Sequence, residues 1–312
     1  MEKLQYGILS TSSIAPRFIA AVRAADAGEI TALSSRTLEK AREKAAEWDI
    51  PTAYGSHGEL LQDKRVNIVY ISNVNTGHYP WAKAALLAGK HVICEKPCTT
   101  TQEQTKELYE LAKKQGLFFM EAQKMLFLPA VLAVKERLEN LGQVTMVEMS
   151  HSFPAAYNGW MFDKEAGGGP LLSSGIYAVH LISWLFGRIT EIRGIASKLD
   201  NGVEWQYILT GQTETGVLFS AKNSTRAVLD NTCRIFGEKG YIELPNYWKA
   251  RKAVLHIGGE TEILEYPCEH ELVYEAEHIA ECMEKGMQNS PVITEALSLE
   301  GIRAIEQVKT GW

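Results

Sequence analysis

The sequence lacks the features of membrane-spanning and nucleic-acid-binding proteins. No apolar run among its 312 residues is long enough to cross a bilayer. The formal net charge of −6 argues against nucleic acid or an anionic membrane surface as the main partner. The first residues, Met1 to Tyr6, show neither the basic region nor the apolar run of a secretory signal. A hydrophobic content of 46% with 22% charged residues is typical of an ordinary soluble protein.

Cysteine is also scarce. The 5 cysteines are odd in number and show no C-x-x-C spacing. Free thiols in a reducing cytoplasm are the simplest explanation, so we expect a cytoplasmic protein. Cys94 and Cys98 lie close enough in sequence to be considered as metal ligands. Cys94 ends an apolar strand, however, and no histidine pair with ligand spacing lies nearby, so we expect no metal site.

Apolar runs and amphipathic segments alternate in the first part of the chain. Strands are expected over 6–9, 30–33, 67–72, 91–94 and 117–120, with helices over 16–22, 38–48, 59–61, 78–87 and 101–114. Such alternation with short connections predicts an α/β domain with a parallel, doubly wound sheet. We place this domain at residues 1–121.

The pattern changes beyond residue 121. One helix over 129–140 precedes strand-like runs over 144–153, 189–197, 207–213, 216–223, 232–236, 241–244 and 253–257. Segments 213–216 and 237–240 have the composition of hairpin turns. Helices over 272–286 and 294–310 close the chain. We therefore expect a second, α+β domain at residues 122–312, with a large and mostly antiparallel sheet.

Glycine is missing from the loop after the first strand. Where a dinucleotide-binding loop has G-x-G-x-x-G/A, the chain has Ser10-Thr11-Ser12-Ser13-Ile14-Ala15, and only Ala15 fits that pattern. Serine is small, and hydroxyls together with helix N-terminal amides also bind phosphate. The candidate cofactor contacts in this loop are Ser10, Thr11, Ser12 and Ile14. A plain tight turn explains the loop equally well.

No carboxylate follows the second strand either. An acidic residue there would accept hydrogen bonds from the ribose 2′-hydroxyl of NAD. The chain has Ser35 and Arg36 instead. Hydroxyls and a guanidinium suit a 2′-phosphate through charge-assisted hydrogen bonds, which favours NADP, with NAD as the alternative. A helix cap next to a solvated arginine is the structural interpretation of the same residues.

The segment from Gly89 to Pro97 is the one around which the rest is arranged. It has a short apolar strand that ends in Glu95 and Lys96. Pro97 cannot donate to a sheet and favours an extended Lys96. The charged pair therefore lies at the carboxyl end of a strand, where open α/β sheets bind ligands. A solvated charge pair at a strand end is the alternative.

Several segments in a fixed order carry a family resemblance. They are Gly7-Ile8-Leu9-Ser10, Gly89-Lys90-His91-Val92-Ile93-Cys94-Glu95-Lys96-Pro97, Phe119-Met120-Glu121-Ala122, Gly167-Gly168-Gly169-Pro170-Leu171-Leu172, Gly175-Ile176-Tyr177 and, near the C-terminus, Lys285-Gly286-Met287 with Ser290-Pro291-Val292-Ile293. In these the chain resembles the Gfo/Idh/MocA oxidoreductase family, and within it the dimeric dihydrodiol dehydrogenase branch. The likeness covers nearly the whole length.

The resemblance implies a Rossmann domain that binds NAD(P). It also implies a second domain whose open sheet mediates contacts in a homodimer or homotetramer. By this likeness Lys96 contacts substrate and cofactor, and Glu95 helps to fix the strand end. Asn73, Asn75 and His78, on the loop that follows the strand over 67–72, are expected beside the cofactor.

Tyr177 matches the position where the family has a tyrosine or histidine as acid/base. Reduction of a carbonyl by hydride leaves negative charge on oxygen, so a proton donor must lie within hydrogen-bond reach. A phenol has a pKa near 10, and a nearby ammonium such as that of Lys96 lowers it. The ammonium also stabilises the oxyanion. The alternative for Tyr177 is a structural residue of a helix over 175–186.

The chain also departs from the family pattern. Ser173 stands where many members have an aspartate, and Lys124 follows the F-M-E-A segment where the branch has an aromatic residue. His180 lies one helical turn after Tyr177, as a proton partner or as a structural histidine. We take Lys124, Ser173 and His180 as candidate substrate residues. For the aromatic residues before the glycine run, Tyr157, Trp160 and Phe162, packing is preferred over a role in a substrate pocket.

The sequence therefore predicts an NADP-preferring dehydrogenase or reductase that acts on a sugar, polyol, dihydrodiol or small carbonyl compound. Lys96 and Tyr177 are its predicted catalytic residues. Two alternatives stay open: a dinucleotide-binding sensor without turnover, suggested by Ser10, Ser12 and Ser173, and a glycosidase that retains NAD as an internal redox partner.

Overall fold

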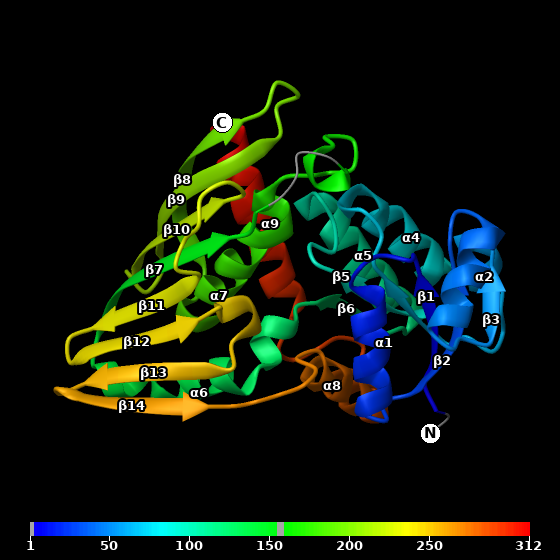
Figure 1. Cartoon of the computed structure of the whole chain (residues 1–312), viewed down its shortest axis with the longest axis horizontal. Coiled ribbons are helices and arrows are strands. Elements are labelled where there is room, and N and C mark those ends of the chain that lie inside the picture. Colours follow the sequence, from blue (N-terminus) through cyan, green and yellow to red (C-terminus); the bar gives the residue numbers. More distant parts are fainter. Residues whose placement is uncertain (1–2, 155–158) are drawn as a thin grey trace. The chain divides into compact units, whose positions relative to one another are not determined.

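The computed structural model describes residues 3–154 and 159–312 of the chain. The chain forms two compact units (Figure 1). Residues 1–123 and 270–295 form the first unit, and residues 124–269 and 296–312 form the second. The segment 270–295, which the division by sequence leaves in the second domain, therefore packs with the first. Among the described residues, no helix combines the length and the apolar character that a membrane crossing requires.

The first unit is built on a 6-stranded sheet in the order β3-β2-β1-β4-β5-β6, with every pair parallel. Its strands are β1 (Gln5–Leu9), β2 (Glu29–Ser34), β3 (Thr52–Tyr54), β4 (Ile68–Ile71), β5 (His91–Glu95) and β6 (Phe119–Ala122). Its helices are α1 (Ala15–Ala24), α2 (Leu38–Glu47), α3 (His57–Leu61), α4 (Asn75–Leu87), α5 (Gln102–Gln115) and α8 (Val273–Glu284). The predicted doubly wound parallel sheet is confirmed.

Three of the six helix starts that the structure describes in this unit, those of α2, α3 and α5, carry a capping side chain. The hydroxyl of Thr37 accepts the N–H of Lys40 at the start of α2, and that of Ser56 accepts the N–H of Glu59 at α3. Each cap satisfies an amide that has no partner within the helix. Helix α1 has no side-chain cap at Ile14, as α4 and α8 have none at their starts, and its first turn holds no acidic residue. The first amides of α1 already have backbone acceptors, because Ala15 donates to the carbonyl of Ser12 and Arg17 to that of Ile14, and Pro16 has no N–H.

The centre of the sheet is held by three aromatic rings. The ring of Phe18, on α1, stacks on Tyr70 of β4 at 3.8 Å between centroids and meets Tyr6 of β1 edge-on at 5.7 Å. All three side chains are fully buried. Removing each from water stabilises the fold by about 2 kcal/mol. These contacts fix α1, and with it the loop that precedes it, against the sheet.

The second unit contains an 8-stranded sheet in the order β14-β13-β12-β11-β7-β10-β9-β8. Its strands are β7 (Val144–Ser152), β8 (Ile189–Lys198), β9 (Glu204–Thr213), β10 (Leu218–Ser224), β11 (Thr232–Gly237), β12 (Gly240–Pro245), β13 (Lys252–Ile257) and β14 (Glu260–Glu265). The pairs are antiparallel apart from β7 with β10. The predicted large, mostly antiparallel sheet is confirmed.

Helices pack on one face of this sheet. They are α6 (Pro129–Arg137), α7 (Ile176–Phe186) and α9 (Glu295–Thr310). The unit also contains short 3₁₀ turns at Lys124–Phe127, Leu138–Leu141, Trp160–Phe162 and Tyr247–Lys249. A π-helical turn at Leu171–Gly175 directly precedes α7. Residues on β9 alternate accordingly. Tyr207 and Leu209 are buried, whereas Ile208 between them is 58% exposed on the opposite face.

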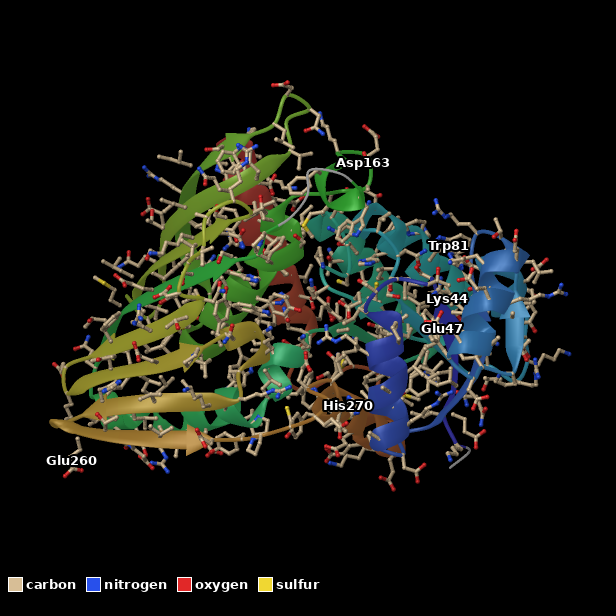
Figure 2. The ribbon with its side chains drawn as sticks, in the orientation of Figure 1. Lys44, Glu47, Trp81, Asp163, Glu260 and His270 are labelled. Carbon is tan, nitrogen blue, oxygen red and sulfur yellow. The ribbon has the colours of Figure 1, made fainter. Side chains whose placement is uncertain are left out.

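Some elements differ from the sequence prediction. The pattern does not predict β14, because its sequence Glu-Thr-Glu-Ile-Leu-Glu has no strict alternation of apolar and polar residues. β14 is an edge strand, and its charges oppose pairing with another chain (Glu260 is labelled in Figure 2). β3 is too short to leave a pattern. Helix α4 begins at Asn75 rather than near His78, and α6 ends at Arg137 in a 3₁₀ turn.

Candidate active site

The serine loop lies at the carboxyl end of β1. Ser10 has a φ of 105°, in the region that favours glycine, and its N–H donates to the carbonyl of Ser34 over 3.1 Å. The hydroxyls of Ser12 and Ser72 are 2.8 Å apart. The loop is therefore held by the ends of β2 and β4. It leads directly into the start of α1, and a loop that enters a helix N-terminus suits a phosphate group.

The end of β2 carries hydroxyls and a cation. Ser35 is 7% exposed, and Arg36 beyond it is exposed. Arg36 makes no ion pair with any residue that the structure describes. Ser34, the last residue of β2, is fully buried. An unpaired guanidinium next to a serine fits an anionic group such as the 2′-phosphate.

The loops after β4 and β5 are joined through His78. Its Nδ1 lies 2.7 Å from the carbonyl oxygen of Pro97, and its Nε2 lies 2.9 Å from that of Asn73. Burial lowers the pKa of His78, against the two carbonyls and Glu95, which raise it. Asn75, which begins α4, is 3% exposed. The ring thus holds two of the predicted cofactor loops in one arrangement.

Asn73 provides a further sign that the edge is built for a ligand. The side-chain oxygen Oδ1 of Asn73 is buried, and it has no hydrogen-bond partner in the part of the chain that the structure describes. A buried oxygen of this kind costs stability unless a donor reaches it. The hydroxyls and amide groups of a dinucleotide are donors of the kind that it needs. The residues at this edge therefore fit such a cofactor.

Glu95 and Lys96 follow β5, with half-buried side chains. Oε1 of Glu95 accepts a hydrogen bond of 2.7 Å from the hydroxyl of Tyr70, and Oε2 accepts the N–H of Lys96 over 3.2 Å. The peptide bond between Lys96 and Pro97 is cis. The carboxylate of Glu95 is thus tied to β4 and to its own chain, which gives the strand end that carries Lys96 a fixed conformation.

The second unit holds the other predicted residues. Tyr177 lies in the first turn of α7 and is 9% exposed. Ser173 lies in the π-helical turn before it, and its hydroxyl donates to the carbonyl of Gly169 over 2.8 Å. His180 is fully buried, with its ring against Gly301, where an added Cβ would lie 2.2 Å from Nε2. This packing favours the structural interpretation of His180.

The remaining predicted side chains differ in their burial. Lys124, in the 3₁₀ turn after the first unit, is 7% exposed. Phe162 is 5% exposed and its carbonyl accepts a hydrogen bond from Asn201, so it packs in the unit, whereas Trp160 is 42% exposed. Tyr157 lies outside the described residues. No group of three or more His, Cys, Asp and Glu side chains placed to hold a metal ion occurs over 3–154 and 159–312.

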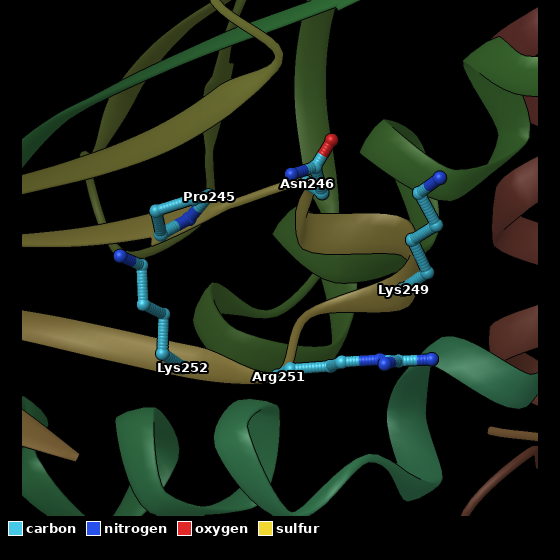
Figure 3. Close-up of a pocket in the computed structure, with 5 residues that line it drawn as sticks. All are labelled: Pro245, Asn246, Lys249, Arg251 and Lys252. Carbon is cyan, nitrogen blue, oxygen red and sulfur yellow. The ribbon is translucent and has the colours of Figure 1, made fainter. Parts of the chain in front are cut away.

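A pocket of about 260 Å³ in the second unit involves none of the predicted residues (Figure 3). It is lined by Pro245, Asn246, Lys249, Arg251 and Lys252. The side chains of Lys249 and Lys252 extend on opposite sides in Figure 3, and that of Arg251 lies along a third direction. The three cations do not converge on one point, so we assign no ligand to this pocket.

The sequence pattern does not identify two polar residues that contact the predicted site segments, His57 and Glu204. His57, on α3, contacts Ser34 and Asn73, and the edge of Trp81 meets its ring at 4.8 Å between centroids (Trp81 is labelled in Figure 2). Glu204 of β9 binds the backbone N–H of Leu171. Both are single polar residues without a motif, and their partners lie 23 and 33 positions away in sequence. The sequence offers no signal by which to find them.

A doubly wound parallel sheet with hydroxyls and an exposed arginine at its carboxyl edge is the architecture of dinucleotide-binding proteins. Family models match both units. The model described as "Oxidoreductase family, NAD-binding Rossmann fold" matches residues 4–123, and the "GFO/IDH/MocA C-terminal domain" matches residues 131–243. The chain belongs to the Gfo/Idh/MocA family of oxidoreductases, as the sequence predicts.

Curated relatives agree over nearly full length. The chain is 31% identical over 306 residues to trans-1,2-dihydrobenzene-1,2-diol dehydrogenase of Mus musculus, a match that covers 93% of this chain and 91% of the relative. It is 32% identical over 323 residues to the enzyme of the same name from Sus scrofa, with 98% and 96% covered. These relatives confirm the predicted branch of the family.

Solved structures share the fold. A levoglucosan dehydrogenase in complex with NADH and levoglucosan superposes with a TM-score of 0.89 at 19% identity, covering 99% of this chain and 96% of that one. The 3-ketoreductase KijD10 of Actinomadura kijaniata, in complex with NADP and TDP-benzene, gives 0.92 at 22% identity, covering 99% and 98%. Together with the family assignment, these findings identify the chain as an NAD(P)-dependent oxidoreductase.

Proposed function

We propose that this oxidoreductase prefers NADP and acts on a hydroxyl or carbonyl group of a sugar, polyol, dihydrodiol or small carbonyl compound. The observation that carries the cofactor preference is Arg36, exposed and unpaired among the described residues, beside Ser35 at an end of β2 that has no carboxylate. The substrate class is supported by the names of the relatives, which are dihydrodiol dehydrogenases.

Each end of the cofactor has candidate residues in the first unit. We propose that the pyrophosphate is held by Ser10, Thr11, Ser12 and Ile14, because they form the loop between β1 and the start of α1, whose first turn holds no acidic residue. Ser35 and Arg36 are proposed to hold the 2′-phosphate. Asn73, Asn75, His78, Glu95 and Lys96 are proposed to line the nicotinamide side.

When bound, the nicotinamide supplies or accepts the hydride. We propose Tyr177 as the group that donates a proton to the carbonyl oxygen in reduction and takes it back in oxidation. Lys96 is proposed to stabilise the negative charge on that oxygen and to orient the substrate. Lys124 and Ser173 remain candidates for substrate contacts, whereas the complete burial of His180 supports a structural role for it.

The experiment that tests the proposal is a fluorescence titration of the purified protein with NADPH and with NADH, followed by a turnover screen over sugars, polyols, dihydrodiols and small carbonyl compounds. Tight NADPH binding with weak NADH binding and turnover of one class supports it. Binding of neither cofactor would refute it. Tight binding without turnover of any class would favour a dinucleotide-binding sensor.

The glycosidase alternative has its own readout. It predicts release of a chromogenic aglycone from a glycoside without net consumption of cofactor. Adding such a glycoside to the same screen separates this chemistry from net oxidation or reduction. Aglycone release at constant NADPH would replace the proposed reaction.

The open face of the eight-stranded sheet supports a proposed homodimer or homotetramer. Leu218, Met146, Phe236, Tyr241 and His256 are consecutive cross-strand neighbours on that face. Leu218 is 49% exposed and Met146 43%, and Ile195 and Ile208, a cross-strand pair of β8 and β9, are 81% and 58% exposed. Apolar side chains that line up across a sheet favour association with a second copy.

A cytoplasmic location is also proposed. All of Cys94, Cys98, Cys233, Cys268 and Cys282 are free, and four of them are buried. Free thiols persist in a reducing compartment. Fractionation of the source cells tests this, and recovery of the protein outside the cytoplasm would refute it.

A further inference from the structure

The turn that precedes Tyr177 is built around a carboxylate from a distant strand. Gly169 and Pro170 lead into the π-helical turn Leu171–Gly175, and α7 continues from it with Tyr177 as its second residue. π-Helical turns are rare and strained relative to the α-helix, so they need support from their surroundings. Whatever holds this turn also sets the position of Tyr177.

Glu204, at the start of β9, provides this support. Its Oε1 accepts the backbone N–H of Leu171 over 2.9 Å, and the residue is 4% exposed. Gly169 has a φ of 112°, and a Cβ added there would lie 2.2 Å from the same Oε1. The carboxylate therefore fills the space beside Gly169, and the glycine is required for that approach.

The location of the carboxylate suits the helix start: burial raises the pKa of Glu204, and the hydrogen bond from Leu171 and the charge of Lys309 oppose this shift. Leu171 donates one of the first amides of the continuous helical stretch from Leu171 to Phe186, and those amides have no partner within the helix. A carboxylate at a helix N-terminus is stabilised by the helix dipole. A hydrogen bond to an ionised acceptor is also stronger than a neutral one.

The sheet supports the same turn at two more points. The amide Nδ2 of Asn223 donates to the hydroxyl of Ser174 over 2.9 Å. Tyr207 packs against Gly175, where an added Cβ would lie 2.8 Å from its hydroxyl oxygen. Glu204, Tyr207 and Asn223 are each at most 4% exposed. The neighbouring strands β9 and β10 thus hold the turn at Leu171, Ser174 and Gly175.

We propose that Glu204 is a positioning residue for Tyr177: its carboxylate fixes the π-helical turn from which Tyr177 projects. Glu204 binds a backbone N–H at the helix start. Ser173 does not take its place, because the Ser173 hydroxyl donates to the carbonyl of Gly169. This inference rests on the proposed catalytic role of Tyr177. The support of the turn by β9 and β10 is a structural property that can be measured without turnover.

The test uses Glu204→Gln, which keeps the size and one acceptor oxygen but removes the charge. The matched control is Glu300→Gln, because Glu300 in the same unit also accepts a backbone N–H, that of Ile189, over 2.7 Å. For Glu204→Gln we expect kcat to fall about fivefold to tenfold. We also expect an unchanged Kd for NADPH and faster amide exchange over 169–177. Glu300→Gln should leave kcat and this exchange unchanged.

A double variant decides whether Glu204 acts through Tyr177. In a Tyr177→Phe background, Glu204→Gln should cause no further fall in the residual kcat, because the group that it positions is gone. An equal fall in both backgrounds, or an unchanged kcat in Glu204→Gln alone, would overturn the inference. If Tyr177→Phe alone leaves the rate unchanged, the inference fails although the oxidoreductase function stands.

Hydrogen exchange distinguishes failure of the proposed function from failure of the positioning role of Glu204. If the wild-type protein turns over no substrate, the proposed function fails, and exchange over 169–177 still reports on the support of the turn. Faster exchange in Glu204→Gln but not in Glu300→Gln then supports the positioning role. Unchanged exchange in both overturns it.

Discussion

The side chains of His57 and Ser34 lie 2.7 Å apart, Nδ1 to Oγ, at the buried end of β2. On the other side of the ring, Nδ2 of Asn73 donates to Nε2 over 3.0 Å. Because Nε2 accepts that bond, the hydrogen of the neutral ring lies on Nδ1 and points to Ser34. Burial lowers the pKa of His57 to about 4. A neutral histidine thus joins the ends of β2 and β4 beside the proposed cofactor site.

This relationship predicts a pH dependence of stability. The pKa of His57 is about 4 in the folded chain against 6.5 ordinarily, so between these values the unfolded chain binds more protons. Stability must therefore fall as the pH drops from 6.5 toward 4. The contribution of His57 is on the order of 2 kcal/mol. In His57→Gln, the loss of unfolding free energy over this window should be smaller by that amount, as measured by urea unfolding.

His256→Gln is the control for this measurement, because it removes a histidine from strand β13 instead of the core of the first unit. It should leave the acid loss of stability as in the wild type. An acid loss in His57→Gln that equals that of the wild type would mean that protonation of His57 does not oppose folding.

Arg36→Ala should weaken NADPH binding much more than NADH binding. Charge-assisted hydrogen bonds contribute about 1.5–3 kcal/mol, so the Kd for NADPH should rise roughly tenfold to a hundredfold. The Kd for NADH, which has no 2′-phosphate, should change little. Titration of both cofactors measures this. The exposed Arg42 on α2 provides the control Arg42→Ala, and equal losses for the two cofactors in Arg36→Ala would contradict a role in reading the phosphate.

Tyr177→Phe should lower kcat roughly a hundredfold or more, because it removes the proposed proton donor but keeps the ring. Affinity for NADPH should stay nearly the same. Steady-state kinetics and cofactor titration check both points. The control is Tyr241→Phe on β12, in the open face of the sheet. A wild-type rate in Tyr177→Phe would remove this residue from the mechanism.

Ile208→Lys should dissociate the proposed dimer or tetramer. The change places a charge on a side chain that is 58% exposed on the open face, opposite Ile195 in the next strand. Light scattering after gel filtration measures the mass. Val228→Lys is the control, since Val228 is 86% exposed but lies outside the strands. A wild-type protein of monomer mass, or an unchanged assembly in Ile208→Lys, would rule out this face as the interface.

Much of the fold follows from local patterns in the sequence. The almost wholly apolar β4 indicates a strand covered on both sides, and the alternation around it indicates a parallel sheet. The pattern is weaker where burial is partial, so it fails for the three-residue β3 and for the charged edge strand β14. The Glu95-Lys96-Pro97 and Gly167–Leu172 motifs identify the family, because the combination is specific in type and order.

The sequence by itself determines the class of this protein: a parallel sheet with a serine loop, an arginine in place of an acid after β2, and the motifs of a dinucleotide-dependent oxidoreductase. Only the tertiary structure decides which residues distant in sequence contact the serine loop, the strand ends and the turn before Tyr177. It brings His57 to Ser34, Glu204 to Leu171, and the segment 270–295 to the first unit. The physical reason is that periodicity records which face of an element is buried. Which polar side chain satisfies a buried amide or hydroxyl depends on how remote strands are brought together.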